Sequence, residues 1–323
     1  MLMNLEILFN FCMVMGVTIA ISSNNWVTIW LGIELSMMSF IPIMSKKFKL
    51  NSESCIKYFI IQSLSSSIMM MGVIMMSMLT LNTMVLLMSI LLKLGVTPFH
   101  TWVVSIIEGM GYYPILLMLT LMKLAPINML MYINENVNLF IIMGLMIGSI
   151  SGLNQNSIKK ILVYSSIFNM SLILSCTESL EIWSTYFSMY SISLMLTNYL
   201  IMKLNLNFIN QMIINNFNIS IKICCWFTLL SMGGFPPFMG FFGKLLVIKF
   251  MLAKNEFLNT AIMMMTSLMV MFFYTRMVIM STIMFFNIPK WLVTTKLNFN
   301  SFIIITSIML PLTLFNLKSL QGF

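Results

Sequence analysis

Charged residues are so scarce in this sequence that the chain cannot form a water-soluble surface. Only 8% of its 323 residues are charged and 60% are hydrophobic, whereas a soluble domain carries about 25% charged residues. Lipid must therefore cover most of the surface. A membrane-spanning helix needs about 20 apolar residues, so the chain has room for roughly 10 to 12 spans.

The apolar runs are long and do not alternate with polar residues, which favours helices over a transmembrane barrel. We therefore predict an all-α polytopic membrane protein with eleven spans and no soluble domain. The fourth and ninth spans contain interruptions. The predicted spans are 3–21, 26–44, 57–79, 83–105, 112–131, 138–154, 158–175, 181–202, 223–250, 258–285 and 302–317.

Lysines in the predicted loops indicate the orientation. Ten lie on the side of the amino terminus, and two or three lie on the opposite side. Positive loops stay on the cytoplasmic side, or on the matrix side in mitochondria, so we place the amino terminus there. The basic residues form no stripe with interleaved aromatics, so nucleic acid is not an expected partner. The ten are Lys46, Lys47, Lys49, Lys57, Lys159, Lys160, Lys203, Lys222, Lys290 and Lys296.

The composition indicates a mitochondrial gene. Methionine is unusually frequent at 39 residues, and Arg276 is the only arginine among 17 basic residues. Both features fit an AT-rich genome in which the codon AUA is read as methionine. No basic residue precedes Lys46, so we expect neither a secretory signal nor a basic transit peptide.

The two interrupted spans share the motif Gly-x-x-Pro-Phe, at Gly95 to Phe99 and at Gly234 to Phe238. Proline removes an amide donor and clashes with the preceding turn, so both helices should break. Each broken span is the fourth of five, in residues 1–131 and 138–285, and one more helix follows at 302–317. Five spans per repeat invert the second copy, and paired broken helices point to a transport site. A packing kink is the alternative.

Four ionisable residues lie within spans or beside the breaks. Glu34 is in the middle of the second span, Lys93 precedes the first break, Lys123 lies in the fifth span and Lys244 follows the second break. Insertion of such a charge costs about 2.5 to 3.5 kcal/mol, so four unpaired charges would cost about as much as a protein's whole stability. We predict that they face the bundle interior and relay protons, because a buried lysine can lose its proton and an arginine cannot.

Each relay residue also has a structural interpretation. Glu34 could serve only as the ionic partner of a lysine, and Lys93 and Lys244 could have packing roles at the breaks. Lys123 could extend its amine to the membrane interface.

Four further charged or titratable residues lie nearer the span ends. His100 could carry protons, or it could be a hydrogen-bonded structural residue beside the proline of the break. We expect Arg276 to anchor a span end. Glu108 and Glu135 are predicted to be solvated in loops.

Other site chemistry is missing from the sequence. There is no phosphate loop and no dinucleotide fingerprint, and a single histidine excludes haem held by two histidines. Redox chemistry must therefore belong to another chain. The cysteines Cys12, Cys55, Cys176, Cys224 and Cys225 are odd in number and scattered, so we expect buried thiols and neither disulfides nor a metal site. Gly144, Gly148 and Gly152 are predicted to allow close helix packing.

Several of these segments together resemble a known family. They are Trp30 to Leu35, Leu91 to Trp102, Lys123 to Ile127, and Gly234 to Lys244. Their residues and order resemble the antiporter-like membrane subunits of NADH–ubiquinone oxidoreductase, respiratory complex I, and especially the mitochondrially encoded subunit 2 of an insect or similar invertebrate.

The resemblance implies a fold of two inverted five-helix repeats and one proton channel, driven by quinone reduction elsewhere in the complex. By matched position, Glu34 and Lys93 would be the glutamate–lysine pair, Lys123 the central relay lysine and Lys244 the lysine of the second broken helix. A departure is Gly243, because relatives more often have proline before this lysine.

The resemblance also implies partners and a location. The chain would bind no cofactor, while FMN, iron–sulfur clusters and ubiquinone would be held by partner subunits. Its neighbours would be other antiporter-like and small membrane subunits and lipids such as cardiolipin, in the mitochondrial inner membrane. The competing hypotheses are a free-standing cation/proton transporter and a purely structural membrane subunit.

Overall fold

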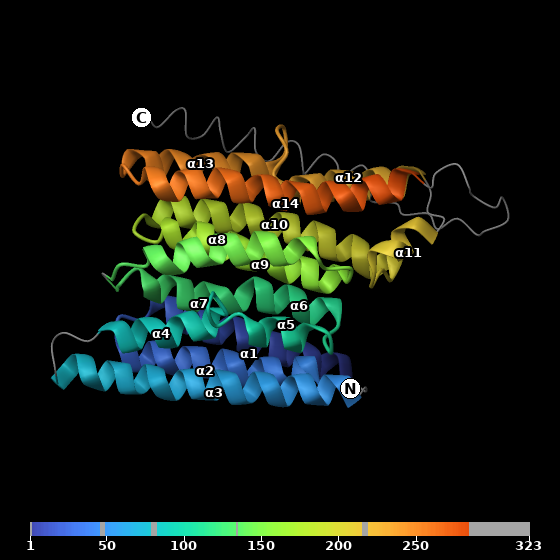
Figure 1. Cartoon of the computed structure of the whole chain (residues 1–323). Coiled ribbons are helices and arrows are strands. Elements are labelled where there is room, and N and C mark those ends of the chain that lie inside the picture. The colour runs from blue at the N-terminus through green and yellow to red at the C-terminus, as the bar shows by residue number, and fades with distance from the viewer. Residues whose placement is uncertain (1, 46–48, 79–82, 134, 215–218, 284–323) are drawn as a thin grey trace. The chain divides into compact units, whose positions relative to one another are not determined.

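The computed structural model describes residues 2–45, 49–78, 83–133, 135–214 and 219–283. The chain divides into two compact units, Met1–Gly144 and Leu145–Phe323. Helices make up most of the described residues (Figure 1). The predicted helix at 302–317 lies outside these residues.

Six apolar stretches in the described part of the chain are long enough to cross a membrane. This confirms the prediction of an all-α polytopic membrane protein. Shorter apolar helices occupy Thr83–Leu94, Asn138–Leu153 and Ile223–Gly233. The six long stretches are Leu5–Ser22, Trp26–Met44, Asn51–Met76, Tyr112–Leu130, Ile158–Ser175 and Phe257–Ser281.

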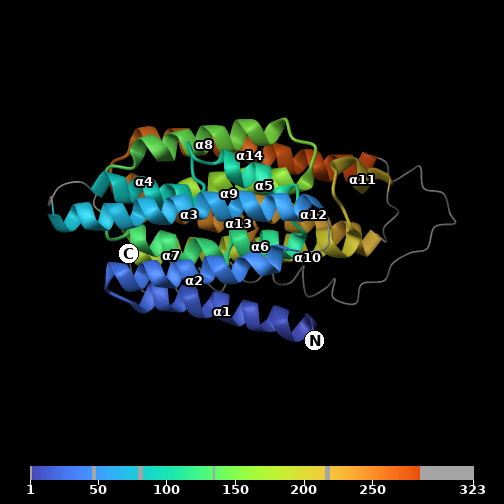
Figure 2. The ribbon, with the colours of Figure 1, turned by 90° about the horizontal axis from the view of Figure 1, so that it is seen from below.

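The first unit contains seven complete helices among its described residues. α2 packs between α1 and α3, and α4 packs against α3 and α7. The helices α4 and α5 lie end to end, as do α6 and α7 (Figure 1). Figure 2 shows α1 beside α2. The bounds are α1 Leu2–Ser22, α2 Trp26–Met44, α3 Lys49–Met78, α4 Thr83–Leu94, α5 Thr101–Ile107, α6 Tyr112–Leu119 and α7 Leu121–Leu130.

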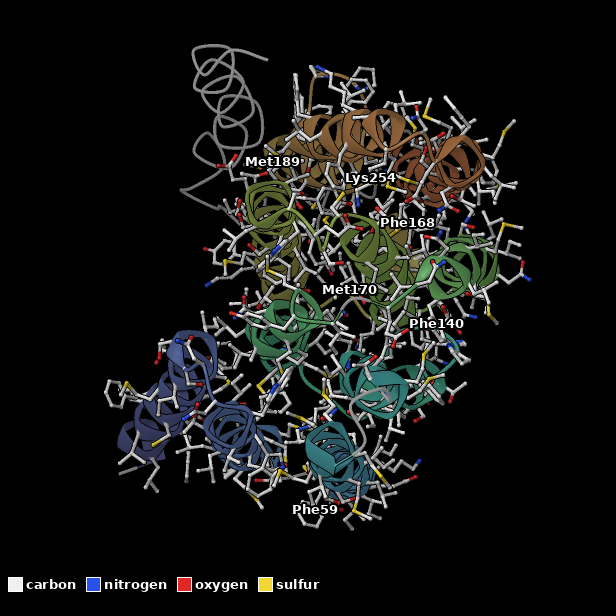
Figure 3. All side chains as sticks on the ribbon, turned by 90° about the vertical axis from the view of Figure 1, so that its left-hand side faces the viewer. Phe59, Phe140, Phe168, Met170, Met189 and Lys254 are labelled. Atoms are coloured by element: carbon white, nitrogen blue, oxygen red, sulfur yellow. The ribbon has the colours of Figure 1, made fainter. Side chains whose placement is uncertain are left out.

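The second unit is built around α9, which has the largest buried share of the long apolar helices. α8 begins in the first unit and ends in the second. Phe168 of α9 is fully buried, whereas Phe59, on α3 of the first unit, is exposed (Figure 3). The bounds are α8 Asn138–Leu153, α9 Ile158–Ser175, α10 Leu180–Leu204, α11 Ile209–Ile214, α12 Ile219–Gly233, α13 Met239–Ala253 and α14 Phe257–Ile283.

Two sequence predictions need correction. The segment from Lys203 to Lys222 is not only a loop, because it contains α11 and the start of α12. Its apolar residues Ile209 and Met212 are buried, and α11 packs against α14. The fifth predicted span is interrupted at Thr120, which separates α6 from α7.

Candidate functional site

Both predicted breaks are confirmed, and both begin with the same backbone structure. Gly95 and Gly234 have φ values of 66° and 83°, a left-handed conformation that favours glycine. The amide of each glycine, and of the residue after it, donates to carbonyls in the last turn of the preceding helix. This is the Schellman ending of a helix. Each break therefore exposes a helix carboxyl end, which carries partial negative charge.

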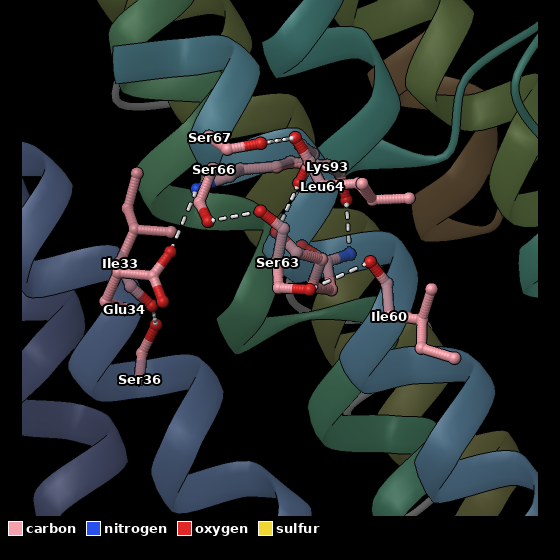
Figure 4. Close-up of polar contacts among 11 residues, drawn as sticks. Ile33, Glu34, Ser36, Ile60, Ser63, Leu64, Ser66, Ser67 and Lys93 are labelled. Atoms are coloured by element: carbon pink, nitrogen blue, oxygen red, sulfur yellow. Dashed lines mark hydrogen bonds and ion pairs between the residues drawn. The ribbon is translucent and has the colours of Figure 1, made fainter.

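Lys93 lies in the last turn of α4, where its ammonium group meets Glu34 of α2. The distance between Lys93 Nζ and Glu34 Oε1 is 3.9 Å, and the side chains are 3% and 19% exposed (Figure 4). Lys93 Nζ makes no hydrogen bond to the described residues. The contact is therefore an ion pair without a fixed hydrogen bond.

The strength of this pair can be compared with the cost of placing its charges in the membrane. At an effective dielectric constant of 20, opposite charges about 4 Å apart attract by about 4 kcal/mol. Insertion costs about 2.5 to 3.5 kcal/mol for each charge. The attraction thus offsets little more than the insertion cost of one of the two charges. The remaining cost must be met by polar surroundings or by the loss of a charge.

Polar side chains do surround the pair. Lys93 and Lys123 line one cavity together with Ser36, Tyr58, Gln62 and Trp102. Lys123 is only 5% exposed, so the interpretation that it extends to the membrane interface is wrong. The other lining residues are apolar, and the polar groups within the cavity can hold bound water. The structure therefore brings Glu34, Lys93 and Lys123 together within the first unit.

The helix α3 contributes Tyr58 and Gln62 to this cavity, and it carries several serines whose hydroxyl donors are paired. Its serine hydroxyls donate to backbone carbonyls one turn earlier, as at Ser63, Ser66 and Ser67 (Figure 4). Such bonds let an apolar helix carry serines inside a membrane. Gln62 is 7% exposed and donates to the carbonyl of Lys93 at 3.4 Å.

Lys244 belongs to the second unit and has different partners. Its Nζ donates to the carbonyl of Gly233, the last residue of α12, at 2.7 Å, and lies 5.5 Å from the ring centroid of Phe168. The side chain is buried. The carboxyl end of α12 therefore stabilises the ammonium group directly.

A second cavity surrounds Lys244. It is lined by Asn169, Tyr186, Tyr190, Ser193 and Ser231, among other residues. The hydroxyl of Tyr186 donates to Asn169 Oδ1 at 2.9 Å. No carboxylate lines this cavity among the described residues.

The residue before Lys244 also has a role in packing. A Cβ atom at Gly243 would lie 2.9 Å from Tyr186 Cδ2. The close approach of the tyrosine ring thus requires glycine here, and α13 continues through this position.

The other titratable residues have structural surroundings. His100 Nδ1 lies 3.2 Å from the carbonyl of Pro98, which favours the structural interpretation of this histidine. Arg276 donates to the carbonyls of Leu153 and Gln155, so it anchors the end of α8.

The two loop glutamates differ from each other. Glu108 is exposed, as predicted. Glu135 is half-buried and accepts a hydrogen bond from Thr83. It lies in a loop, as predicted, but is only partly exposed, because the segment before α8 folds against the start of α4.

The glycines of α8 serve packing, as predicted. A Cβ atom at Gly148 would lie 2.8 Å from the backbone nitrogen of Phe168, so α8 and α9 approach closely there. The five cysteines are free thiols. In the described part of the chain, no group of three or more His, Cys, Asp or Glu side chains could hold a metal ion.

Sequence analysis missed the neutral residues of both cavities. Gln62, Tyr58 and Trp102 surround Lys93, and Asn169 and Tyr186 lie beside Lys244. Gln62 and Asn169 were detectable, because each is an amide in the middle of an apolar span. Tyr58 and Trp102 carry no such signal, since aromatic residues are common in membrane helices.

Two helices broken at glycine, each with a buried lysine beside the break, define a polytopic membrane protein of the antiporter type. The sequence matches the family described as NADH:quinone oxidoreductase/Mrp antiporter, TM, over residues 23–82 and 77–270. The chain belongs to this family.

Curated relatives cover nearly the whole chain. The NADH-ubiquinone oxidoreductase chain 2 of Anopheles gambiae is 35% identical over 91% of this chain and 90% of its own length. The protein of the same name from Dasypus novemcinctus is 32% identical over 95% of this chain and 96% of its own.

A solved structure supports the fold. A chain of respiratory complex I from Thermus thermophilus, solved with bound aureothin, matches with a TM-score of 0.77 and 17% identity. The match covers 96% of this chain and 77% of that one. At this identity the likeness concerns the fold alone.

Proposed function

We propose that this chain is the antiporter-like, proton-translocating membrane subunit of a respiratory complex I in the mitochondrial inner membrane. The family and the names of its relatives support this assignment. Electron transfer from NADH to ubiquinone would take place in other subunits, which would hold FMN and the iron–sulfur clusters. Neighbouring antiporter-like and small membrane subunits, and lipids such as cardiolipin, would surround the chain.

The membrane topology is part of the proposal. Eleven spans would form two inverted repeats, residues 1–131 and 138–285, followed by a helix at 302–317. The amino terminus would lie on the matrix side, as the loop lysines favour. The matching Schellman endings at Gly95 and Gly234 support an internal repeat.

The proton relay would consist of Glu34, Lys93, Lys123 and Lys244. The observation that carries it is the shared cavity of Lys93 and Lys123, with Glu34 at 3.9 Å from Lys93. When the carboxylate moves away, the ammonium of Lys93 loses an attraction of about 4 kcal/mol. Its proton can then pass through the polar cavity to Lys123, and Lys244 would deliver a proton toward the opposite side.

Proton counting in the assembled complex tests this function. The complex carrying Lys93→Ala, Lys123→Ala or Lys244→Ala is placed in sealed vesicles, and the protons moved per NADH oxidised are measured. We expect each variant to move fewer protons than the wild type. An unchanged ratio in all three assembled variants would instead support a purely structural subunit.

The free-standing transporter is the second candidate, because the matched family includes Mrp antiporters. Size measurement of the chain after gentle detergent extraction separates the two. A large assembly containing NADH-oxidising subunits supports the first function, and a chain extracted alone supports the second.

A further inference from the structure

Two carbonyl groups at the carboxyl end of α4 accept hydrogen bonds from neutral donors on other helices. Trp102 Nε1 of α5 donates to the carbonyl of Leu92 at 3.1 Å. Gln62 Nε2 of α3 donates to the carbonyl of Lys93 at 3.4 Å. Both side chains are 7% exposed, so neither bond competes with bulk solvent.

The second unit shows what a lysine does at the same kind of helix end. At the carboxyl end of α12, the carbonyl of Gly233 accepts its hydrogen bond from Lys244 itself. An ammonium group is attracted to a helix carboxyl end both by its partial charge and by its unpaired carbonyls.

Lys93 also lies close enough to a helix carboxyl end for its ammonium group to be attracted to the carbonyls. It lies in the last turn of α4, and lysines there commonly bond to the final carbonyls of their own helix. Its amine instead makes no hydrogen bond to the described residues and faces Glu34 at 3.9 Å. Two carbonyls within reach of this amine, those of Leu92 and Lys93, already have donors.

We infer that Trp102 and Gln62 are positioning residues that occupy the carboxyl end of α4 and thereby leave the Lys93 amine to Glu34 and the cavity. The inference rests on the proposed relay, because it assigns these residues a role only through Lys93. Both also line the cavity that Lys93 shares with Lys123. If the carbonyls of α4 held the Lys93 amine, it could not pass a proton to Lys123 through this cavity.

The test compares tryptophan variants in the assembled complex. Trp102→Phe keeps an aromatic ring and removes the N–H donor, whereas Trp102→His restores a donor on a smaller ring. Gln62→Met removes the other donor at similar volume. Trp226→Phe is the matched control, because that indole donates to Ser281 and not to a helix end. Protons moved per NADH, the amount of assembled complex and the Lys93 position by electron cryomicroscopy are measured.

We expect Trp102→Phe to lower the protons moved per NADH by most of the decrease that Lys93→Ala causes. Trp102→His should restore most of this decrease. Trp226→Phe should equal the wild type. In the Trp102→Phe structure, Lys93 Nζ should lie within hydrogen-bond distance of the Leu92 carbonyl. If Trp102→Phe does not assemble, Gln62→Met must show the same loss and bring the amine to the Lys93 carbonyl.

Three outcomes would overturn the inference. In the first, Trp102→Phe moves as many protons per NADH as Trp226→Phe, although Lys93→Ala is defective. The proposed relay would then stand, and Trp102 would have no positioning role. Trp102→Phe and Trp102→His could lose pumping equally, which assigns the effect to ring packing. Lys93→Ala could pump normally, and then the proposed relay fails together with the inference.

Discussion

The two broken helices have the same backbone ending but stabilise their lysines in different ways. In the first unit the lysine precedes the break, and its partner is the carboxylate of Glu34 at 3.9 Å. In the second unit the lysine follows the break, and its partner is the carbonyl of Gly233 at 2.7 Å. Two residues before its glycine, α12 has the buried residue Met232, whereas α4 has Lys93 at the same distance from Gly95.

This difference separates a movable counterion from a fixed one. Glu34 is a side chain on a neighbouring helix and can change its distance from Lys93. The carboxyl end of α12 is backbone and cannot move away without unfolding a turn. A charge held by a carboxylate can be controlled by motion, whereas a charge held by a helix end changes mainly when a proton arrives or leaves.

The largest effect is expected when either buried lysine, Lys93 or Lys244, is replaced by methionine. Lys244→Met and Lys93→Met should both lower the protons moved per NADH. Lys244→Met should also reduce the amount of assembled complex, because the buried carbonyl of Gly233 loses its donor at a cost of about 1 to 3 kcal/mol. Lys249→Met, at an exposed position of α13, is the control. Equal pumping by Lys244→Met and Lys249→Met would contradict the role of Lys244.

The next effect tests the movable counterion. Glu34→Gln leaves the Lys93 charge unpaired, and loss of one partner of a buried pair costs about 3 to 5 kcal/mol. We expect less assembled complex and weaker pumping. The double variant Glu34→Gln with Lys93→Gln should recover assembly on native gels without recovering pumping. Recovery of both would mean that the pair has only a structural role.

Alanine at the two left-handed glycines should distinguish the breaks. A Cβ atom at Gly234 would lie 2.7 Å from Lys244 Nζ, whereas at Gly95 it would clash with Val103 Cγ2. Both changes strain a positive φ, which costs about 1 kcal/mol or more. We expect both to reduce assembly, and Gly234→Ala to reduce pumping more for each assembled complex. The reverse order would show that the lysine tolerates displacement from the carbonyl.

The smallest expected effect is at Tyr186. Tyr186→Phe removes the hydrogen bond to Asn169 Oδ1 in the cavity of Lys244, and such a bond contributes about 1 kcal/mol. A modest loss of thermal stability of the complex with nearly unchanged pumping is expected. A pumping loss as large as that of Lys244→Met would add this hydroxyl to the relay.

Local chemistry explains how much of the fold was predictable. The apolar runs identified the helices, and Gly95 and Gly234 identified both breaks, because glycine and proline act on the backbone at their own positions. The interruption at Thr120 was not predictable, since neither Thr120 nor its neighbours Leu119 and Leu121 are helix-breaking residues. The helix α11 was missed because its apolar face is short and is buried only when α11 packs against α14 in the folded protein.

The candidate site was predictable in its charged residues and not in its neutral ones. Glu34, Lys93, Lys123 and Lys244 stand out because charge is costly in lipid wherever the rest of the chain lies. Trp102 and Gln62 became visible only through the carbonyls that they bond. The half-buried position of Glu135 likewise depends on its contact with Thr83, which is 52 residues away in sequence.

The sequence by itself determined that this chain lies in a membrane as helices, where two of them break, and which residues carry charge inside. These properties depend on hydrophobicity and backbone freedom, which each segment carries alone. Only the tertiary structure decided which donor reaches which carbonyl, and that one lysine faces a carboxylate while the other bonds a helix end. Those pairings join residues on different helices, and packing alone brings them within reach.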